Sequence, residues 1–174
     1  MNTERNKALF LDRDGIVNRD LSYIYKPEQV VFQEGIFAVC KKAFKKGYRI
    51  VIVTNQSGIA RGYFSESDLI NLNTWMKREF LQKGIELSGI YYCPHHKEGK
   101  IKKYAYDCDC RKPMPGMILK AASDLKLSIP ESLMIGDKES DRIQLNGLRS
   151  YIIKSGYTEE NYDLESIEDV ISIL

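Results

Sequence analysis

The chain has 174 residues, with 26 lysine and arginine residues against 24 aspartate and glutamate residues and a formal net charge of +2 at neutral pH. This length fits one α/β domain over residues 1–174 and is too short for two full domains. The small net charge gives no sign of a polyanionic partner, so we expect no nucleic-acid partner and attribute phosphate binding to locally placed residues.

The sequence also lacks the features of a membrane-spanning or exported chain. No run approaches the roughly 20 apolar residues needed to cross a bilayer, and the first apolar stretch, 8–11, ends at a pair of acids. The start of the chain shows no basic segment, apolar segment and small-residue cleavage site in succession. We therefore expect a cytoplasmic protein without a membrane partner, and we also expect a monomer.

Apolar runs alternate with stretches of helical spacing from the start of the chain. The run 8–11 and the β-branched run 49–54 are typical of strands buried on both faces of a sheet. Between them, apolar residues recur at helical spacing over 36–44, and Gly47 is suited to end that helix. These segments predict a β–α–β unit.

The alternation continues through the rest of the chain. A capping signal at 65–68 opens a long helix whose apolar face runs from Leu69 to Phe80 and which ends at Gly84. We further predict strands and helices over these approximate ranges: strands at 90–93, 133–135 and 151–153, and helices at 117–125, 140–148 and 165–173. The pattern predicts a doubly wound parallel sheet, whose ligands bind at the carboxyl ends of the strands.

Unusual polar residues follow the predicted strands. They are Asp12 and Asp14 after the first strand, Thr54 and Asn55 after the second, and Asp137 after the fourth. Two carboxylates about 4 Å apart repel by about 4 kcal/mol at an effective dielectric of about 20, so two ionised acids at one strand end require cations. Oxygen ligands at a phosphate site suit Mg²⁺, and Lys112 and Lys138 supply further positive charge. The segment 12–15 by itself is equally typical of a capped turn, so the other positions carry this inference.

Four segments together resemble the motifs of one enzyme superfamily. They are Asp12-Arg13-Asp14-Gly15, TNQSGIARG at 54–62, Arg111-Lys112-Pro113 and GDKESD at 136–141. From about residue 9 to 151 the chain resembles the haloacid dehalogenase (HAD) superfamily of phosphatases. Within that superfamily it is similar to the D-glycero-D-manno-heptose 1,7-bisphosphate phosphatases, with the phosphatase part of the histidinol-phosphatase enzymes as the next relative. The resemblance implies a HAD-like Rossmannoid fold without a large cap domain, and removal of the C7 phosphate on the route to a nucleotide-activated heptose.

The resemblance also implies roles for individual residues. Asp12 would attack phosphorus and form an aspartyl-phosphate, while Asp14 would act as general acid and then as general base. Thr54 and Lys112 would hold the phosphoryl oxygens. Asp12, the backbone carbonyl of Asp14 and the side chain of Asp137 would bind Mg²⁺.

A further set of residues is expected to contact the sugar phosphate. These candidates are Asp20, Tyr23, Asn55, Gln56, Ser57, Arg111 and Lys138. The family pattern assigns Asp20, Tyr23 and Arg111 to the sugar hydroxyls and the second phosphate. Asp20 and Tyr23 are also ordinary surface turn residues, whereas a guanidinium beside Lys112 suits phosphate geometry.

Three of the four cysteines lie in one short loop, at about 93–112, together with histidine. A Cys-x-His knuckle starting at Cys93 and a Cys-x-Cys knuckle formed by Cys108 and Cys110 give three thiolates and one imidazole, which is the closed set of a structural zinc site. Spacing leaves His95 and His96 as alternatives, and the family resemblance favours His95. Zinc would hold this polar loop in place.

Three other functions compete with this one. The same chemistry on another substrate, chiefly histidinol phosphate, is the first. A zinc-stabilised binding module without catalysis is the second, and phosphotransfer by a mutase is the third. The complete set of catalytic residues counts against a binding module, and a mutase would need a sizeable cap to shield the aspartyl-phosphate from water.

Overall fold

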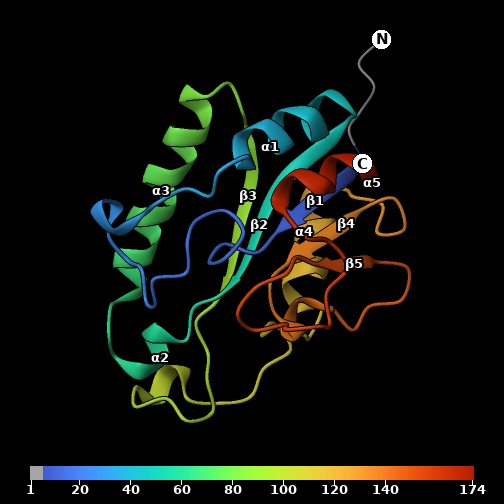
Figure 1. Cartoon of the computed structure of the whole chain (residues 1–174). Helices are drawn as coiled ribbons and strands as arrows, with labels where there is room; N and C mark the ends of the chain where they lie inside the picture. The colour runs from blue at the N-terminus through green and yellow to red at the C-terminus, as the bar shows by residue number, and fades with distance from the viewer. Residues whose placement is uncertain (1–5) are drawn as a thin grey trace.

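The structure, a computed structural model, describes residues 6–174 and is built around a five-stranded sheet (Figure 1). The strand order is β3-β2-β1-β4-β5 and every neighbouring pair is parallel. The strands are β1 (Lys7–Leu11), β2 (Tyr48–Asn55), β3 (Leu87–Cys93), β4 (Leu133–Gly136) and β5 (Arg149–Ile152). The predicted doubly wound parallel sheet is confirmed.

Helices connect the strands in the predicted alternation. The α-helices are α1 (Ile36–Lys45), α2 (Gly58–Arg61), α3 (Glu66–Gln82), α4 (Gly116–Leu125) and α5 (Val170–Ile173). Short 3₁₀ helices are η1 (Pro27–Gln29), η2 (Lys102–Tyr104), η3 (Glu139–Asp141) and η4 (Ile167–Asp169). The predicted cap of α3 is present, since Asp68 N–H donates to Ser65 Oγ at 3.1 Å and Ser65 N–H donates to Asp68 Oδ2 at 2.8 Å.

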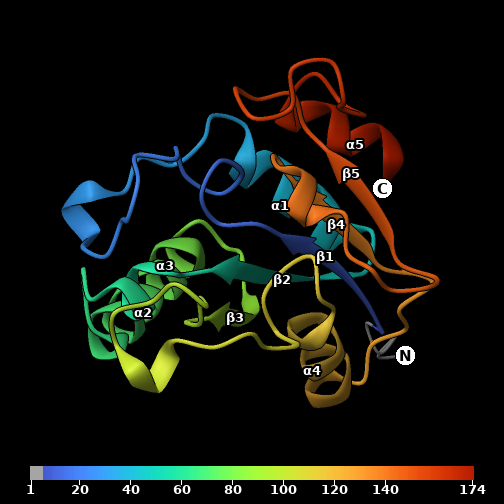
Figure 2. The ribbon, with the colours of Figure 1, turned by 90° about the horizontal axis from the view of Figure 1, so that it is seen from below.

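Two hydrophobic layers cover the two faces of the sheet. Alternate strand residues such as Leu9 and Ile50 pack with α1, α3 and α5, while their neighbours Phe10 and Val51 pack with α4 on the opposite face. Figure 2 shows α4 on one side of the sheet and α1 and α5 on the other. Burial on both faces explains why the strands are apolar along their length.

The topology places the carboxyl ends of three strands together. β1 is the central strand: Leu11 pairs with Ile52 of β2 on one side and with Ile135 of β4 on the other. The chain runs outward from β1 in both directions, and such a reversal point is where open parallel sheets bind ligands. Between β1 and α1 the described chain contains only η1 as a regular element, so no large cap is inserted there.

One predicted element is wrong. Residues 140–148 do not form a helix, and the chain there has only η3 followed by turns. Two features explain the difference: the Asp141 carboxylate accepts backbone N–H groups of its own loop, and Gly147 has a φ of 90°. The Gln144 N–H also donates to the Pro113 carbonyl at 2.9 Å, which ties the segment to a distant loop instead of a helical turn.

The remaining differences concern boundaries and short helices. β3 begins at Leu87, earlier than predicted, and β5 ends at Ile152. The predicted C-terminal helix is present as η4 and α5, whereas η1, α2 and η2 were not predicted. Among the helices of residues 6–174, none is both long enough and apolar enough to span a membrane.

Candidate active site

Asp12 lies directly after β1, at the carboxyl edge of the sheet, and is 5% exposed. Its backbone N–H donates to the Ile135 carbonyl of β4 at 2.9 Å, which fixes it between two strands. Its Oδ1 accepts a hydrogen bond from Lys112 Nζ at 2.7 Å. Burial raises the pKa of Asp12 to about 7, against the opposing effect of Lys112. The charge on this carboxyl group therefore depends on the cations around it.

Lys112 reaches Asp12 from the loop before α4. Asn55 holds its backbone on both sides: Lys112 N–H donates to Asn55 Oδ1 at 3.0 Å, and Asn55 Nδ2 donates to the Lys112 carbonyl at 3.2 Å. Lys112 Nζ also donates to Asp141 Oδ1 at 2.5 Å. Burial alone would lower the pKa of Lys112, but the carboxylates of Asp12 and Asp141 outweigh it and raise the pKa. The ammonium group therefore stays charged beside Asp12.

Three buried acids form a cluster below the end of β1. Asp12, Asp137 and Asp141 offer carboxylate oxygens that lie within 4.8 Å of one another. Asp141 is already engaged, because its Oδ2 accepts the N–H groups of Asp137 and Lys138 at 3.1 Å each. It therefore braces the loop after β4 and leaves Asp12 and Asp137 as the carboxylates that can face a cation.

Asp137 shows that this cluster fits a hard divalent cation. Its Oδ1 is buried and has no hydrogen-bond partner among the described residues, and burial raises its pKa to about 7. Gly15 lies so close that a β-carbon there would come within 2.2 Å of Asp137 Oδ2. An unpartnered buried carboxylate oxygen beside a second acid matches the oxygen ligands that Mg²⁺ prefers. Asp12, Asp137 and the backbone carbonyl of Asp14 remain the predicted ligands.

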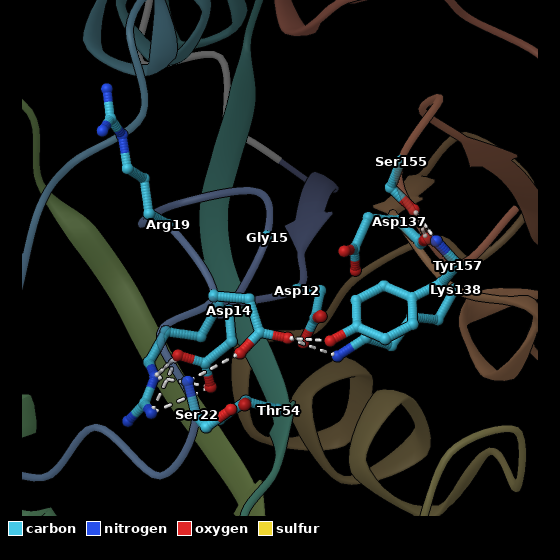
Figure 3. Close-up of polar contacts among 12 residues, drawn as sticks. Asp12, Asp14, Gly15, Arg19, Ser22, Thr54, Asp137, Lys138, Ser155 and Tyr157 are labelled. Atoms are coloured by element: carbon cyan, nitrogen blue, oxygen red, sulfur yellow. Dashed lines mark hydrogen bonds and ion pairs between the residues drawn. The ribbon is translucent and has the colours of Figure 1, made fainter.

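The Asp14 carboxylate is directed into a separate network of donors (Figure 3). Arg13 Nη2 donates to Asp14 Oδ2 at 2.9 Å, Asn18 Nδ2 donates to Oδ1 at 3.0 Å, and Gln56 Nε2 donates to Oδ2 at 3.1 Å. Arg13 is fully buried and also donates to the Ile24 carbonyl at 3.0 Å. The sequence reasoning overlooked Arg13, although its place between the two acids was a usable signal.

Gln56 also connects Asp14 to the end of β2. Its Nε2 donates to Thr54 Oγ1 at 2.9 Å as well as to Asp14. Thr54 is 1% exposed and lies at the carboxyl end of β2, next to Asp12 in the sheet edge. Because Gln56 donates to it, the Thr54 hydroxyl retains its own proton for another acceptor.

A cavity of about 280 Å³ opens over these groups. The residues that line it come from all four motif segments and from the loop after β1: Asp12, Asp14, Asp20, Ser22, Tyr23, Thr54, Asn55, Gln56, Ser57, Gly58, Arg111, Lys112, Lys138, Ser140 and Asp141. Every residue expected to contact the sugar phosphate is in this set. Gly58, where we expected the backbone to pass close to the substrate, also lines the cavity, whereas Ser22 and Ser140 were not anticipated.

Cations and anions share the rim of this cavity. Lys138 Nζ donates to Asp20 Oδ2 at 2.9 Å, so these two predicted substrate contacts are paired with each other. Arg111 Nη1 donates to the His95 carbonyl at 3.4 Å, which connects the rim to the cysteine loop. Arg19, which follows in the loop after β1, points away from Asp12 (Figure 3).

The cysteine loop gathers the four predicted zinc ligands. Cys108 Sγ lies 3.5 Å from Cys93 Sγ and 3.4 Å from Cys110 Sγ, and His95 Nδ1 lies 3.7 Å from Cys93 Sγ and 3.3 Å from Cys110 Sγ. A tetrahedral zinc with these ligands has edges of roughly 3.5–3.8 Å. The four atoms can therefore bind a zinc ion.

The two histidines of this loop have different surroundings. His95 Nε2 lies 2.7 Å from the Tyr106 hydroxyl, a contact that fixes the ring with Nδ1 toward the sulfurs. His96 is partly buried and lies with its Nε2 3.3 Å from Arg61 Nη2. The structure thus places His95, and not His96, in the cysteine cluster that could hold a metal ion.

The fold and the site define a phosphatase of the HAD superfamily, and comparison with known proteins agrees. A family model described as "Polynucleotide kinase 3 phosphatase" matches residues 16–159. The protein from Pasteurella multocida named D-glycero-beta-D-manno-heptose-1,7-bisphosphate 7-phosphatase is 44% identical, with 97% of this chain and 96% of the relative covered. The Burkholderia mallei protein, which is named for the alpha anomer, is 49% identical to this chain. The match covers 79% of this chain and 72% of the Burkholderia mallei protein.

A solved structure extends the similarity to three dimensions. The D,D-heptose 1,7-bisphosphate phosphatase from B. bronchiseptica, complexed with magnesium and phosphate, has a TM-score of 0.78 at 27% identity and covers 96% of this chain and 97% of its own. The chain belongs to the family that the matching model describes and, with these relatives, to the D-glycero-manno-heptose-1,7-bisphosphate 7-phosphatases.

Proposed function

We propose that this protein hydrolyses the C7 phosphate of D-glycero-D-manno-heptose 1,7-bisphosphate through an aspartyl-phosphate on Asp12, in the synthesis of an ADP- or GDP-heptose precursor. The observation that carries the proposal is the buried Asp12 carboxyl group, 2.7 Å from Lys112 Nζ and clustered with Asp137, whose Oδ1 has no partner. The relatives named for this reaction support the choice of substrate.

In the first half-reaction, a carboxylate oxygen of Asp12 attacks phosphorus and the bond from phosphorus to the C7 oxygen breaks. The electron pair leaves with that oxygen, and Asp14 protonates it. Lys112 Nζ lies where it can neutralise the phosphoryl oxygens next to Asp12, and the Thr54 hydroxyl has a free proton to donate to them. Bound Mg²⁺ supplies positive charge that offsets the negative charges of the nucleophile and the phosphate.

In the second half-reaction, water attacks the phosphorus of the aspartyl-phosphate. Asp14, now ionised, removes a proton from this water, and the bond from phosphorus to the Asp12 oxygen breaks, which regenerates the carboxylate and releases phosphate. Arg13, Asn18 and Gln56 hold Asp14 beside the cavity by hydrogen bonds between the two steps. The same carboxyl group can therefore serve as acid first and base afterwards.

Arg111 is suited to hold the phosphate that is not transferred. It lines the cavity on the side of the cysteine loop, and its guanidinium offers the paired donors that phosphate geometry favours. Asp20 and Tyr23 lie in the loop after β1 and line the part of the cavity wall that would face the sugar. These contacts support a preference for a bisphosphate over a monophosphate.

The other parts of the proposal concern the surroundings of this site. Zinc held by Cys93, His95, Cys108 and Cys110 has a structural role, since four protein ligands leave no open position for chemistry. A reducing compartment such as the cytoplasm would keep three thiols this close together unoxidised until zinc binds them. We take the catalytic unit to be a single-domain monomer over residues 1–174 that has a small-molecule substrate and no nucleic-acid or membrane partner.

Steady-state kinetics with Mg²⁺ test the substrate assignment. Both anomers of the heptose 1,7-bisphosphate should be turned over with a higher kcat/KM than histidinol phosphate, and ³¹P NMR should show loss of the C7 phosphate with the C1 phosphate retained. A preference for histidinol phosphate would overturn the substrate and leave the phosphatase chemistry in place. Release of the C1 phosphate would overturn the regiochemistry.

A further inference from the structure

Tyr157, in the C-terminal part of the chain, reaches the rim of the cavity although no motif includes it. Its hydroxyl donates to Asp20 Oδ2 at 3.0 Å, the same oxygen that accepts from Lys138 Nζ at 2.9 Å. The Lys138 ammonium also lies over the Tyr157 ring, 4.3 Å from its centroid. Figure 3 shows the tyrosine beside Lys138. Tyr157 itself is not among the residues that line the cavity.

The turn that carries Tyr157 is attached to the loop after β4. Ser155 Oγ donates to the Asp137 carbonyl at 2.6 Å, and the Tyr157 N–H donates to Ser155 Oγ at 3.1 Å. The Ser155 N–H donates in turn to Thr158 Oγ1 at 3.0 Å. These bonds tie the backbone of Tyr157 to the loop that presents Asp137 and Lys138.

Lys138 needs such support because its side chain is long and flexible. A lysine loses rotamer entropy when its side chain is held in one conformation. Its ammonium has three N–H donors, and within the described chain Asp20 is its recorded hydrogen-bond acceptor. The Asp20 carboxylate and the aromatic face of Tyr157 together restrict the Lys138 ammonium. They leave N–H donors of that ammonium for a ligand in the cavity.

Asp20 is itself held from two sides. Its Oδ1 accepts the Ser22 N–H at 3.1 Å, while its Oδ2 is shared by Lys138 and the Tyr157 hydroxyl. Ser22 and Tyr23 have positive φ angles of 62° and 50°, so this bond helps to stabilise the turn that forms one wall of the cavity. Asp20 therefore orients its neighbours, with its oxygens already engaged.

We propose that Tyr157 is a positioning residue that fixes the Lys138 ammonium toward the substrate phosphate, acting through Asp20 and through its own aromatic face. The inference rests on the proposed phosphatase function. It adds a residue from outside the four motif segments to the machinery that binds phosphate.

The chain offers a matched control in the same tail. The Tyr162 hydroxyl donates to Glu165 Oε1 at 2.6 Å, Lys154 Nζ donates to Glu165 Oε2 at 3.0 Å, and the lysine lies 5.0 Å from the Tyr162 ring centroid. The contacts are of the same kind, but none of these residues lines the cavity. Tyr162→Phe thus removes an equivalent hydroxyl away from the site.

The test compares Tyr157→Phe, which keeps the ring, with Tyr157→Leu, which loses both contacts. With the heptose bisphosphate we expect kcat/KM to fall about three- to tenfold for Tyr157→Phe and about ten- to thirtyfold for Tyr157→Leu, mainly through KM. The inhibition constant of inorganic phosphate should rise in parallel, and Tyr162→Phe should stay within about twofold of the parent. Tyr157 is 61% exposed, so both variants should melt near the parent temperature.

A double-mutant comparison separates positioning from a general structural effect. In a Lys138→Ala background, Tyr157→Phe should cause no further loss, because the group that it positions is gone. An equal proportional loss in both backgrounds, or unchanged kinetics for Tyr157→Leu, overturns the proposal. p-Nitrophenyl phosphate is assayed alongside: if the parent hydrolyses it but not the heptose bisphosphate, the substrate assignment fails and the same comparison still decides the role of Tyr157.

Discussion

The acid cluster after β1 and the cysteine cluster of the 93–110 loop are both suited to metal ions, but they are built in opposite ways. Asp12 and Asp137 follow different strands, are nearly fully buried, and leave one carboxylate oxygen without a partner. The cysteine cluster comes from the end of β3 and the loop that follows it, is partly exposed, and its four ligand atoms lie within 4.8 Å of one another. The first arrangement keeps room for a reacting group, whereas the second is closed.

The two clusters meet at Arg111 and Lys112. Both residues follow Cys110 directly, and both line the cavity. Lys112 is also fixed by Asn55, whereas the recorded contact of Arg111 is with the His95 carbonyl inside the cysteine loop. The comparison therefore predicts that chemistry depends on the acid cluster, and that the zinc loop acts mainly on selectivity and stability.

The largest effect is expected for Asp12→Asn. The amide keeps the shape of the side chain but cannot form an acyl phosphate, so turnover should fall by about four orders of magnitude or more, with a melting temperature near that of the parent. Stopped assays with the heptose bisphosphate and a thermal melt measure both quantities. Asp124→Asn, at an exposed ion pair on α4, is the control. Turnover by the Asp12→Asn variant above the level of contaminating phosphatase would show that Asp12 is not the nucleophile. The contrast drawn between the acid cluster and the cysteine cluster would then fail.

A smaller effect is expected for Arg111→Ala. If Arg111 holds the phosphate that is not transferred, kcat/KM for the bisphosphate should fall roughly ten- to a hundredfold, which corresponds to about 1.5–3 kcal/mol of charged hydrogen bonding. A monophosphate of the same sugar should lose much less. Arg19→Ala, whose side chain points away from Asp12, should leave both values unchanged. Equal losses on the two substrates would show that Arg111 does not select the bisphosphate.

The smallest effect on activity is expected from loss of zinc. Metal analysis should find about one zinc per chain in the parent. It should find none in a double variant that carries both Cys108→Ser and Cys110→Ser. The melting temperature should fall by roughly 5–10 °C, while kcat/KM should fall less than for Arg111→Ala because Asn55 still holds Lys112. Cys40→Ala, at a buried thiol of α1, should retain the metal. Stoichiometric zinc in the double variant would show that the cluster is not the site.

Features that follow from local sequence pattern could be predicted well. The strands were visible because both faces of the sheet are covered, which makes segments such as 49–54 continuously apolar. Asp12, Thr54 and Asp137 could be predicted because each lies at the end of such a run, and strand ends meet at one edge of the sheet. The cysteine cluster was visible because its ligands lie close together in the chain.

Features that depend on contacts between distant segments were not visible. The helix predicted at 140–148 is absent because Asp141 is bonded to its own loop and to Lys112, a lysine from another motif. Asn55 was expected to meet the substrate, and its bonds to the Lys112 backbone could not be read from spacing. Tyr157 reaches Asp20 across most of the chain, a pairing that no periodicity reports.

The central place of β1 has a consequence for synthesis of the protein. Among the five strands of the sheet, β1 is made first, and Leu11 finds its partner Ile52 early but its other partner, Ile135, only after most of the chain has been made. A nascent chain can therefore assemble β1, β2 and β3 while one side of β1 stays unpaired. Asp12 is therefore made long before Lys112 and Asp137, so the proposed nucleophile lacks its neighbouring cation and its partner acid until most of the chain exists.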